Sequence, residues 1–146
     1  MENKILDMKY VIENGTDYDY FESEMFTDKL LDPVSGEGCT GLVYESVNEN
    51  QISRYFFYED GFQNGVQVEF HFNGNVKRIE TMKHGRSNGE YKEWSEENTL
   101  IEEGEYRWGV HTKYRKYNID GQLIAEKKGP TDSDLRFIKS AERMYK

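Results

Sequence analysis

The stretch GFQNGVQVEFHFNGNVKRIETMKH (61–84) is followed directly by GRSNGEYKEWSEENTLIEEGEYRW (85–108), and the two align without a gap. Their first residues, Gly61 and Gly85, are followed by Gly109 at the same spacing of 24 residues. A unit of this length cannot bury an apolar face alone, so neighbouring units must stack on one another. The sequence therefore predicts tandem repeats that form an elongated sheet.

The same spacing extends in both directions. Gly41 aligns upstream with Gly65 and Gly89, and downstream one residue is lost before Tyr117 aligns with Trp94. This alignment gives four units, at roughly 37–60, 61–84, 85–108 and 109–129. We expect the whole chain, 1–146, to form one repeat domain.

Residues 1–36 are less regular, and we expect irregular strands there. KILDMKYVI (4–12) reads as an opening strand, and YDYFESEMF (18–26) reads as a decayed unit.

Each unit reads as a β-hairpin. VQVEFHF alternates apolar and polar residues with period two, and Asn73-Gly74 follows it as a strong signal for a two-residue type I′ turn. Asp120-Gly121 gives the same signal in the fourth unit. The expected opposite pairs are Val68 with Ile79, Glu69 with Arg78, Tyr117 with Ile124, and Arg115 with Glu126.

The third unit requires a different turn. A two-residue turn at Glu97-Asn98 would set Glu93 against Glu102, which are like charges. We prefer a three-residue loop, 96–98, with Asn98 in the left-handed region. This loop sets Trp94 opposite Leu100 and Lys92 opposite Glu102.

TDSDLRFIKSAERMYK (131–146) changes to helical spacing after Gly129-Pro130. Within a C-terminal segment 130–146 we predict one helix over 132–145, capped by Thr131 or Ser133. The acids Asp132 and Asp134 near its start and the bases Arg143 and Lys146 near its end suit the helix dipole. The predicted fold class is all-β: an elongated single-layer antiparallel sheet of 24-residue hairpins, with this helix capping the open end of the sheet.

The composition indicates the cellular compartment. Cys39 is the only cysteine, so no internal disulfide is possible and a reducing compartment is expected. The N-terminus holds no apolar run of the length that a signal peptide or membrane helix needs. We therefore expect a cytoplasmic protein.

The formal net charge is −9 and is unevenly spread, because residues 107–146 contain ten Lys or Arg against five Asp or Glu. The acidic remainder would repel nucleic acid and anionic lipid and attract a basic protein. A solvated surface that keeps the sheet soluble explains the same charge equally well.

Aromatic side chains suggest an interaction surface. The run 55–58 (YFFY) must point to both faces of its strand, and more rings gather in the third and fourth units. A one-layer sheet cannot hide both faces, so we expect some rings to be accessible as interface anchors. Stacking between neighbouring units is the structural alternative.

The repeat core NGxxxGxxxxF/Y/WxxxGxL/V resembles the MORN repeat, in the bacterial variant typical of the YwqK-type antitoxin family. Asn64-Gly65, Phe70, Gly74 and Val76 carry it in one unit, and Asn88-Gly89, Trp94, Asn98 and Leu100 carry it in the next. The resemblance covers roughly residues 37–128. It implies an antitoxin or immunity protein, or one of the scaffolds and lipid-kinase regulators in which MORN repeats also occur. Ser46 departs from the motif, because it stands where the motif has an aromatic residue.

Candidate catalytic groups are few. His71, His84 and His111 lack metal-ligand spacing, and Cys39 lies in a glycine-rich turn beside acids that would raise its pKa. The acids are numerous, but a single-layer sheet rarely provides the cleft that paired carboxylates need. We predict no enzyme, no cofactor and no metal site.

The favoured function is therefore an immunity protein or antitoxin that binds a cognate protein toxin directly, for example a basic nuclease domain. The alternative is a MORN-type scaffold or adaptor that binds phospholipid or another protein, supported by the basic C-terminal part. The sequence leaves the oligomeric state open. The residues that we expect at the partner interface are Glu69, Glu93, Trp94, Glu103, Glu105, Tyr106 and Trp108.

Overall fold

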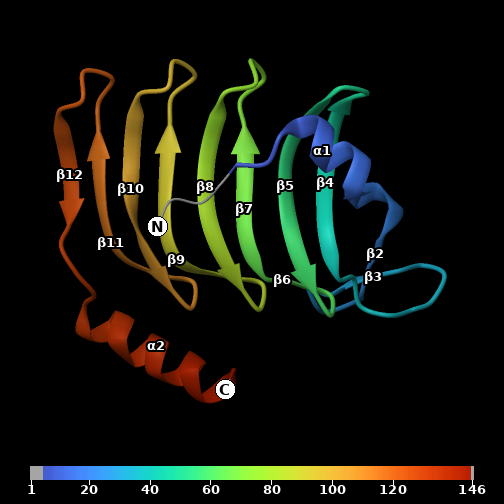
Figure 1. Ribbon diagram of the computed structural model, residues 1–146. Coiled ribbons are helices and arrows are strands. Elements are labelled where there is room, and N and C mark those ends of the chain that lie inside the picture. The colour runs from blue at the N-terminus through green and yellow to red at the C-terminus, as the bar shows by residue number, and fades with distance from the viewer. Residues whose placement is uncertain (1–4, 146) are drawn as a thin grey trace.

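The computed structural model describes residues 5–145. One layer of strands forms the body of the protein, in which β4, β5 and β7 to β12 lie side by side in chain order and run antiparallel (Figure 1). The strands are β4 (Gly41–Asn48), β5 (Gln51–Glu59), β6 (Phe62–Gln63), β7 (Gly65–Phe70), β8 (Val76–Lys83), β9 (Arg86–Trp94), β10 (Leu100–Arg107), β11 (Val110–Tyr117) and β12 (Leu123–Lys127). With the C-terminal helix α2 (Asp132–Met144), they confirm an all-β chain that ends in a helix.

Two-residue turns close the end of the sheet that is lowest in Figure 1, here called the lower end. These turns are Asp60-Gly61, His84-Gly85 and Trp108-Gly109, and both residues of each have positive φ. This is the geometry of a type I′ turn, whose second position favours glycine because a Cβ is strained there. Glycines at a spacing of 24 residues therefore mark the lower turns.

At the opposite, upper end the loop between β4 and β5 has two residues, 49–50, and the other three loops have three residues each. In each three-residue loop one residue has positive φ: Gly74 (91°), Asn98 (68°) and Gly121 (83°). The left-handed Asn98 is as predicted. The type I′ turn predicted at Asn73-Gly74 is wrong: Asn73 is not among the positive-φ residues, and the N–H of Gly74 donates to the carbonyl of His71 over 2.9 Å.

Each hairpin then contains one extra residue in its second strand. The strand register identifies these bulged residues as Ser53, Lys77, Ile101 and Ile124. The hairpin of β4 and β5, whose loop has only two residues, has a second bulged residue, Val47, in its first strand. A bulge sets two residues against one, so it offsets the extra residue of the loop. Beyond the bulge the register is therefore the one that a two-residue turn would give.

The bulges decide which of the predicted cross-strand pairs are confirmed. Val68 lies opposite Ile79, Glu69 opposite Arg78, Arg115 opposite Glu126, and Trp94 opposite Leu100, as predicted. Two predictions are wrong because the bulge had not been foreseen. Lys92 lies opposite Glu103 and not Glu102, whose partner is Glu93, and Tyr117 lies opposite Leu123 and not Ile124.

The N-terminal segment differs from the prediction. Where a strand was expected over 4–12, the structure has α1 (Met8–Asn14), and residue 4 lies outside the described residues. Met8, Val11 and Ile12 have the spacing of one helix face, and this face packs on the sheet with Val11 fully buried. The apolar residues of KILDMKYVI had indicated a strand, but the spacing of three of them is that of a helix face, and the segment forms a helix.

Residues 18–26 do not form a decayed hairpin of the main sheet. They contain a 3-10 helix, Tyr18–Tyr20, and β2 (Glu22–Ser23), which pairs only with β3 (Leu30–Leu31). Just before them, β1 (Thr16–Asp17) runs parallel to β4 and adds to that edge of the sheet.

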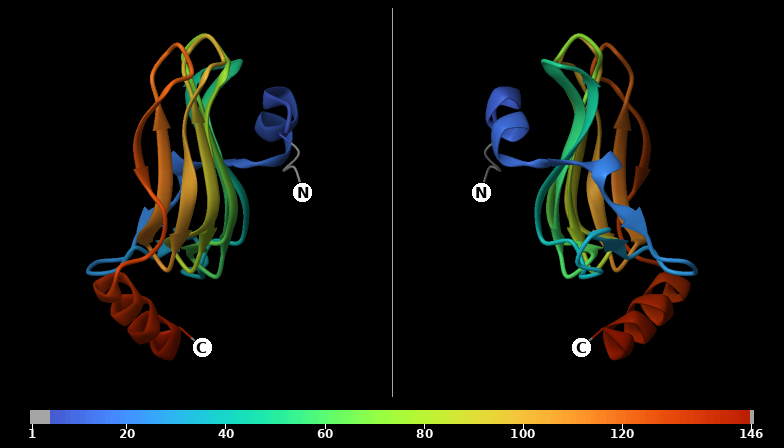
Figure 2. Two further views of the ribbon diagram at one scale, coloured as in Figure 1. Left: turned by 90° about the vertical axis from the view of Figure 1, so that its left-hand side faces the viewer. Right: turned by 90° about the vertical axis from the view of Figure 1, so that its right-hand side faces the viewer.

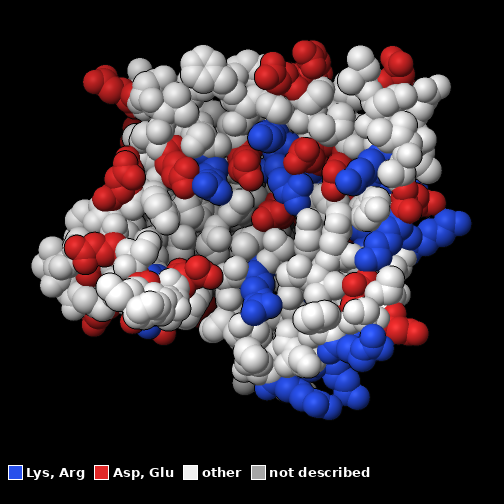
Figure 3. Space-filling view, turned by 180° about the vertical axis from the view of Figure 1, so that it is seen from behind, with Lys and Arg blue, Asp and Glu red and all other residues white. Residues whose placement is uncertain are grey.

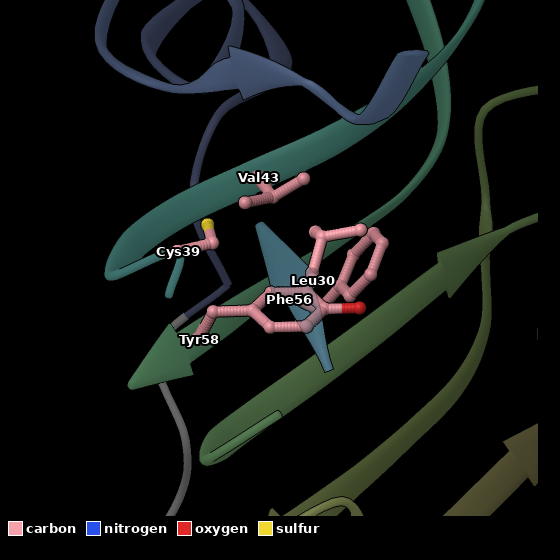
Figure 4. Packing of buried hydrophobic residues seen from close by; sticks show 5 residues of the cluster. All are labelled: Leu30, Cys39, Val43, Phe56 and Tyr58. Atoms are coloured by element: carbon pink, nitrogen blue, oxygen red, sulfur yellow. The ribbon is translucent and has the colours of Figure 1, made fainter. Parts of the chain in front are cut away.

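Both faces of β4 and β5 are covered as a result (Figure 2). We call the face under α1 the front face and the opposite face the back face. On the front face Val11, Ile52, Tyr55 and Val68 form one core. On the back face the chain before β4 helps to form a second core, whose members are Leu30, Cys39, Val43, Phe56 and Tyr58 (Figure 4).

Three of the four rings of the run 55–58 are therefore buried and cannot be interface anchors, and Phe57 is partly buried. Tyr55, Phe56 and Tyr58 are only 1%, 3% and 9% exposed.

The helix α2 begins as predicted. Thr131 is its N-cap and forms a capping box with Asp134, and Asp132 and Asp134 lie in the first turn. Arg143 lies in the last turn, and Lys146 lies outside the described residues. The helix lies beneath the lower turns, whereas β12 ends the strand order (Figure 1). No helix within residues 5–145 combines the length and the apolar character that crossing a membrane requires.

The left-handed loop residue gives a direct test. We expect Asn98→Val to lower the free energy of unfolding by about 1–2 kcal/mol, because a branched side chain is strained at positive φ. Asn98→Gly should leave stability unchanged or raise it. Urea unfolding of both variants measures the difference, and equal stabilities would contradict the three-residue loop.

Candidate functional site

A row of alternating charges crosses the back face of the sheet (Figure 3). The strand register places its members side by side, one from each successive strand: Glu45, Arg54, Glu69, Arg78, Glu93, Glu102 and Lys116. We call it the back-face charge row. Each acid of the row lies beside a basic residue on a neighbouring strand. Much of the negative charge of the back face is therefore neutralised within the sheet.

Arg78 is the centre of this row. Its guanidinium lies 2.9 Å from Glu80 and 3.1 Å from Glu93, and its carbon lies 4.4 Å from the ring centre of Tyr91. Burial alone would lower the pKa of Arg78, but the hydrogen bonds with the two carboxylates outweigh it and raise that pKa. Glu93 is thus engaged by an internal partner.

Beside Arg78 lies a cluster of four rings: Tyr91, Tyr106, His111 and Tyr114. The imidazole of His111 stacks on Tyr106 with ring centres 4.5 Å apart and an angle of 8° between the planes. The hydroxyl of Tyr91 lies 2.5 Å from Glu102 Oε2 and 2.6 Å from His111 Nε2. An ionised carboxylate only accepts, so the phenol donates to Glu102 and accepts from the Nε2–H of His111.

The cluster holds its polar groups in unreactive forms. Burial and the neighbouring Glu102 raise the pKa of Tyr91 far above its ordinary value, so the phenol stays protonated. Burial also lowers the pKa of His111, against the opposing effect of Glu102. Tyr91 packs over Gly104, where an added Cβ would lie 2.9 Å from the ring and 2.3 Å from a backbone carbonyl oxygen. The sequence search missed this cluster, although the lone glycine inside β10 was a signal of close packing.

A shallow trough of about 590 Å³ lies over β9 to β12. The register continues from Val68 and Ile79 to Lys92 and Glu103, so these charged side chains share the front face with α1. We call this hollow the front trough. Acids predominate at the wall formed by β9 and β10, where Glu90 and Glu103 lie with Lys92 between them. Bases predominate at the wall formed by β11, β12 and the residue after it, where Lys113, Arg115, Lys127 and Lys128 lie with Glu126.

The charges of the front trough are partly paired. Arg115 Nε lies 2.9 Å from Glu126, and Lys113 Nζ lies 3.6 Å from Glu105. The hydroxyl of Tyr117 donates to Glu103 over 2.7 Å. The trough therefore has an acidic side and a basic side.

A stack of rings closes the lower end. Trp108 lies parallel to Tyr145, just beyond α2, with ring centres 5.3 Å apart, and His84 stacks on Phe62 at 4.5 Å. Arg86 Nε donates to the hydroxyl of Tyr145 over 3.2 Å. These contacts fasten the chain after α2 to two of the lower turns.

The structure does not gather the seven predicted interface residues into one surface. Alternation along the strands and the contacts above divide them: Glu69, Glu93 and Tyr106 lie on the back face, Trp94, Glu103 and Glu105 lie on the front face, and Trp108 lies in the lower stack.

The other candidates are also apart. His84 belongs to the lower stack and His111 to the ring cluster of the back face. Among residues 5–145, no three His, Cys, Asp or Glu side chains form a group that could hold a metal ion. Cys39 is buried, and this burial with the nearby Asp32 raises its pKa to about 11.

A scan against protein-family models, a search of curated proteins and a search of solved structures each returned no match.

The burial of Cys39 predicts slow thiol chemistry. At pH 8 its reaction with a disulfide reagent should be at least about 100-fold slower in the native protein than in urea, because the thiolate fraction is small. Stopped-flow absorbance measures both rates, with Cys39→Ser as the blank. Similar rates in the two states would contradict the buried thiol.

His111 predicts a pH dependence of stability. Its pKa in the folded protein lies below the ordinary 6.5, so the unfolded chain binds this proton first as the pH falls. The free energy of unfolding should therefore decrease between pH 7.5 and 5.5, and it should decrease less in His111→Gln. Urea unfolding of both proteins at both pH values measures these decreases. Because the two proteins have the same carboxylates, the difference between the decreases is the contribution of His111. Parallel pH profiles of the two proteins would refute this.

Proposed function

We propose that this chain is a MORN-type tandem-repeat protein that acts in the cytoplasm as an immunity protein or antitoxin, by binding a cognate protein toxin. The idea of a toxin rests on the resemblance of the repeat core to the YwqK-type antitoxin family. Two recurring features support the repeat: the bulged residues Ser53, Lys77, Ile101 and Ile124, and the lower-turn N–H groups of Gly61, Gly85 and Gly109, which donate to the carbonyls of Cys39, Gln63 and Ser87.

One observation carries the binding function: α1 covers the front face only near β4 and β5, and the front trough lies on the part that remains open (Figure 1). The half-buried Trp94 lies on the same face as Glu103 and Glu105. A flat, hydrogen-bonded sheet keeps such a surface in place without a partner, which reduces the entropy cost of binding. Of the seven predicted interface residues, these three therefore form the best-supported group.

The charge pattern specifies the partner. A basic segment of the toxin, such as part of a nuclease domain, would face Glu90 and Glu103 on the acidic side of the trough, and Glu105 of β10 beside it. An acidic segment of the same toxin would face the basic side, at Lys128. Complementary charges of this kind mainly raise the association rate and select the partner.

The experiment compares two faces of one sheet. The toxin is taken from the gene neighbouring that of this protein, and binding is followed by surface plasmon resonance. Glu103→Lys with Glu105→Lys should slow association about tenfold or more, and Trp94→Ala should mainly speed dissociation. The matched control is Asp19→Lys with Glu22→Lys, two exposed acids of the segment that covers the back face, which should leave both rates nearly unchanged.

Each variant's thermal midpoint is measured beside its kinetics, so that loss of folding is not read as loss of binding. No complex and no rescue of cells that express the toxin would refute the proposed function. Equal effects of the front and back variants would refute the front face as the interface.

The phospholipid-binding alternative has less support. It relied on basic residues of the C-terminal part, and three of these are held by internal ion pairs: Lys113 with Glu105, Arg115 with Glu126, and Lys127 with Asp134. Because these pairs reduce the positive charge offered to an anionic membrane, we favour a protein partner.

A further inference from the structure

The upper loops of the sheet and the outer side of α2, below the opposite end, carry opposite charge. The four upper loops, at 49–50, 72–74, 96–98 and 119–121, together contain four acids and no Lys or Arg. These exposed acids are Glu49, Glu96, Glu97 and Asp120. We call these loops the upper rim, along which Figure 3 shows acidic side chains.

The upper rim also exposes apolar side chains. Phe72 and Ile119 are each 79% exposed, although large apolar residues are usually buried. The loops are fixed to each other: Gln51 Nε2 donates to the carbonyl of Phe72 over 2.6 Å, and the Nδ2 groups of Asn73 and Asn75 both donate to the carbonyl of Glu96. The rim is thus an ordered surface.

The opposite surface lies on the outer side of α2. This side exposes Phe137 (68%) and Met144 (72%). Arg136, Lys139 and Arg143 surround them and are exposed as well. We call these five residues the lower rim. Ile138 and Ala141 form the packed side of the same helix, so its outer side has no partner among the described residues.

We propose that the lower rim of one copy of this chain binds the upper rim of a second copy. Basic and apolar side chains at one end meet acidic and apolar side chains at the other, so the contact is complementary in charge and removes exposed rings from water. Because the two contacting surfaces differ, this contact is heterologous, and each added copy leaves both kinds of rim available. The assembly therefore grows as an open chain, and the net charge of −9 on each copy limits its length.

The test uses variants that remove one rim at a time. The upper-rim variant is Phe72→Ala with Glu96→Gln and Glu97→Gln. The lower-rim variant is Phe137→Ala with Arg136→Gln and Lys139→Gln. All six side chains are exposed, so the fold should survive, and thermal midpoints check that it does.

Sedimentation velocity in about 50 mM salt measures the assembly state. The mass of the wild-type species should rise steadily with concentration, and each variant alone should associate at least tenfold more weakly. An equimolar mixture of the two variants retains one intact contact and should form a 1:1 dimer that does not grow. The matched control, Glu13→Gln with Asp19→Asn, makes the same change of charge as the upper-rim variant but away from both rims, and it should assemble like the wild type.

Several outcomes would overturn the proposal. Wild-type protein that stays monomeric, or that stops at a dimer, excludes open head-to-tail growth. So does a mixture of the variants that forms no dimer. A monomer that sediments with phosphatidylserine vesicles through α2 would show that the lower rim meets a membrane instead. Toxin binding at the front trough does not enter this test, so either proposal can fail without the other.

Discussion

The register of this sheet depends on two extra residues in a hairpin, one in the upper loop and one in the strand after it, whose effects on the strand pairing cancel. Each three-residue upper loop adds one residue, and a bulged residue in the strand that follows removes the offset. Without the bulge, every later side chain of that strand would move to the other face. Ile79 would then leave the core under α1, and Arg78 would leave its two carboxylates. The bulge therefore fixes which residues are core and which are surface.

Much of the fold could be predicted from the sequence because its signals are local. The glycine spacing, the alternation within strands and the Thr131 cap each involve a few neighbouring residues. The third-unit loop was predicted from one unfavourable charge pair. The structure nevertheless places Glu93 opposite Glu102 beyond the bulge, and it satisfies these carboxylates with Arg78 and Tyr91. Contacts with Arg78 and Tyr91 thus offset the repulsion between the two carboxylates. The prediction had considered this repulsion without those partners.

The N-terminal segment and the candidate site were harder to predict, because both depend on contacts between distant residues. The seven helical residues of α1 are too few to be stable alone, and packing of Val11 on β5 is what stabilises them. The segment before β4 buries Phe56 and Tyr58, which no short-range pattern indicates. The expected interface residues were chosen by type, whereas the face of each one depends on alternation and on the position of the bulges.

The coverage of β4 and β5 from both sides has a consequence for folding during synthesis. All the fully buried members of the two cores precede β8 in the chain, so this part of the core can form while the later hairpins are still on the ribosome. Each later hairpin then finds an existing strand edge to pair with, and its loop-closure cost stays small because the partner is its neighbour in sequence. The covered end thus serves as a template on which the sheet extends strand by strand as the chain emerges.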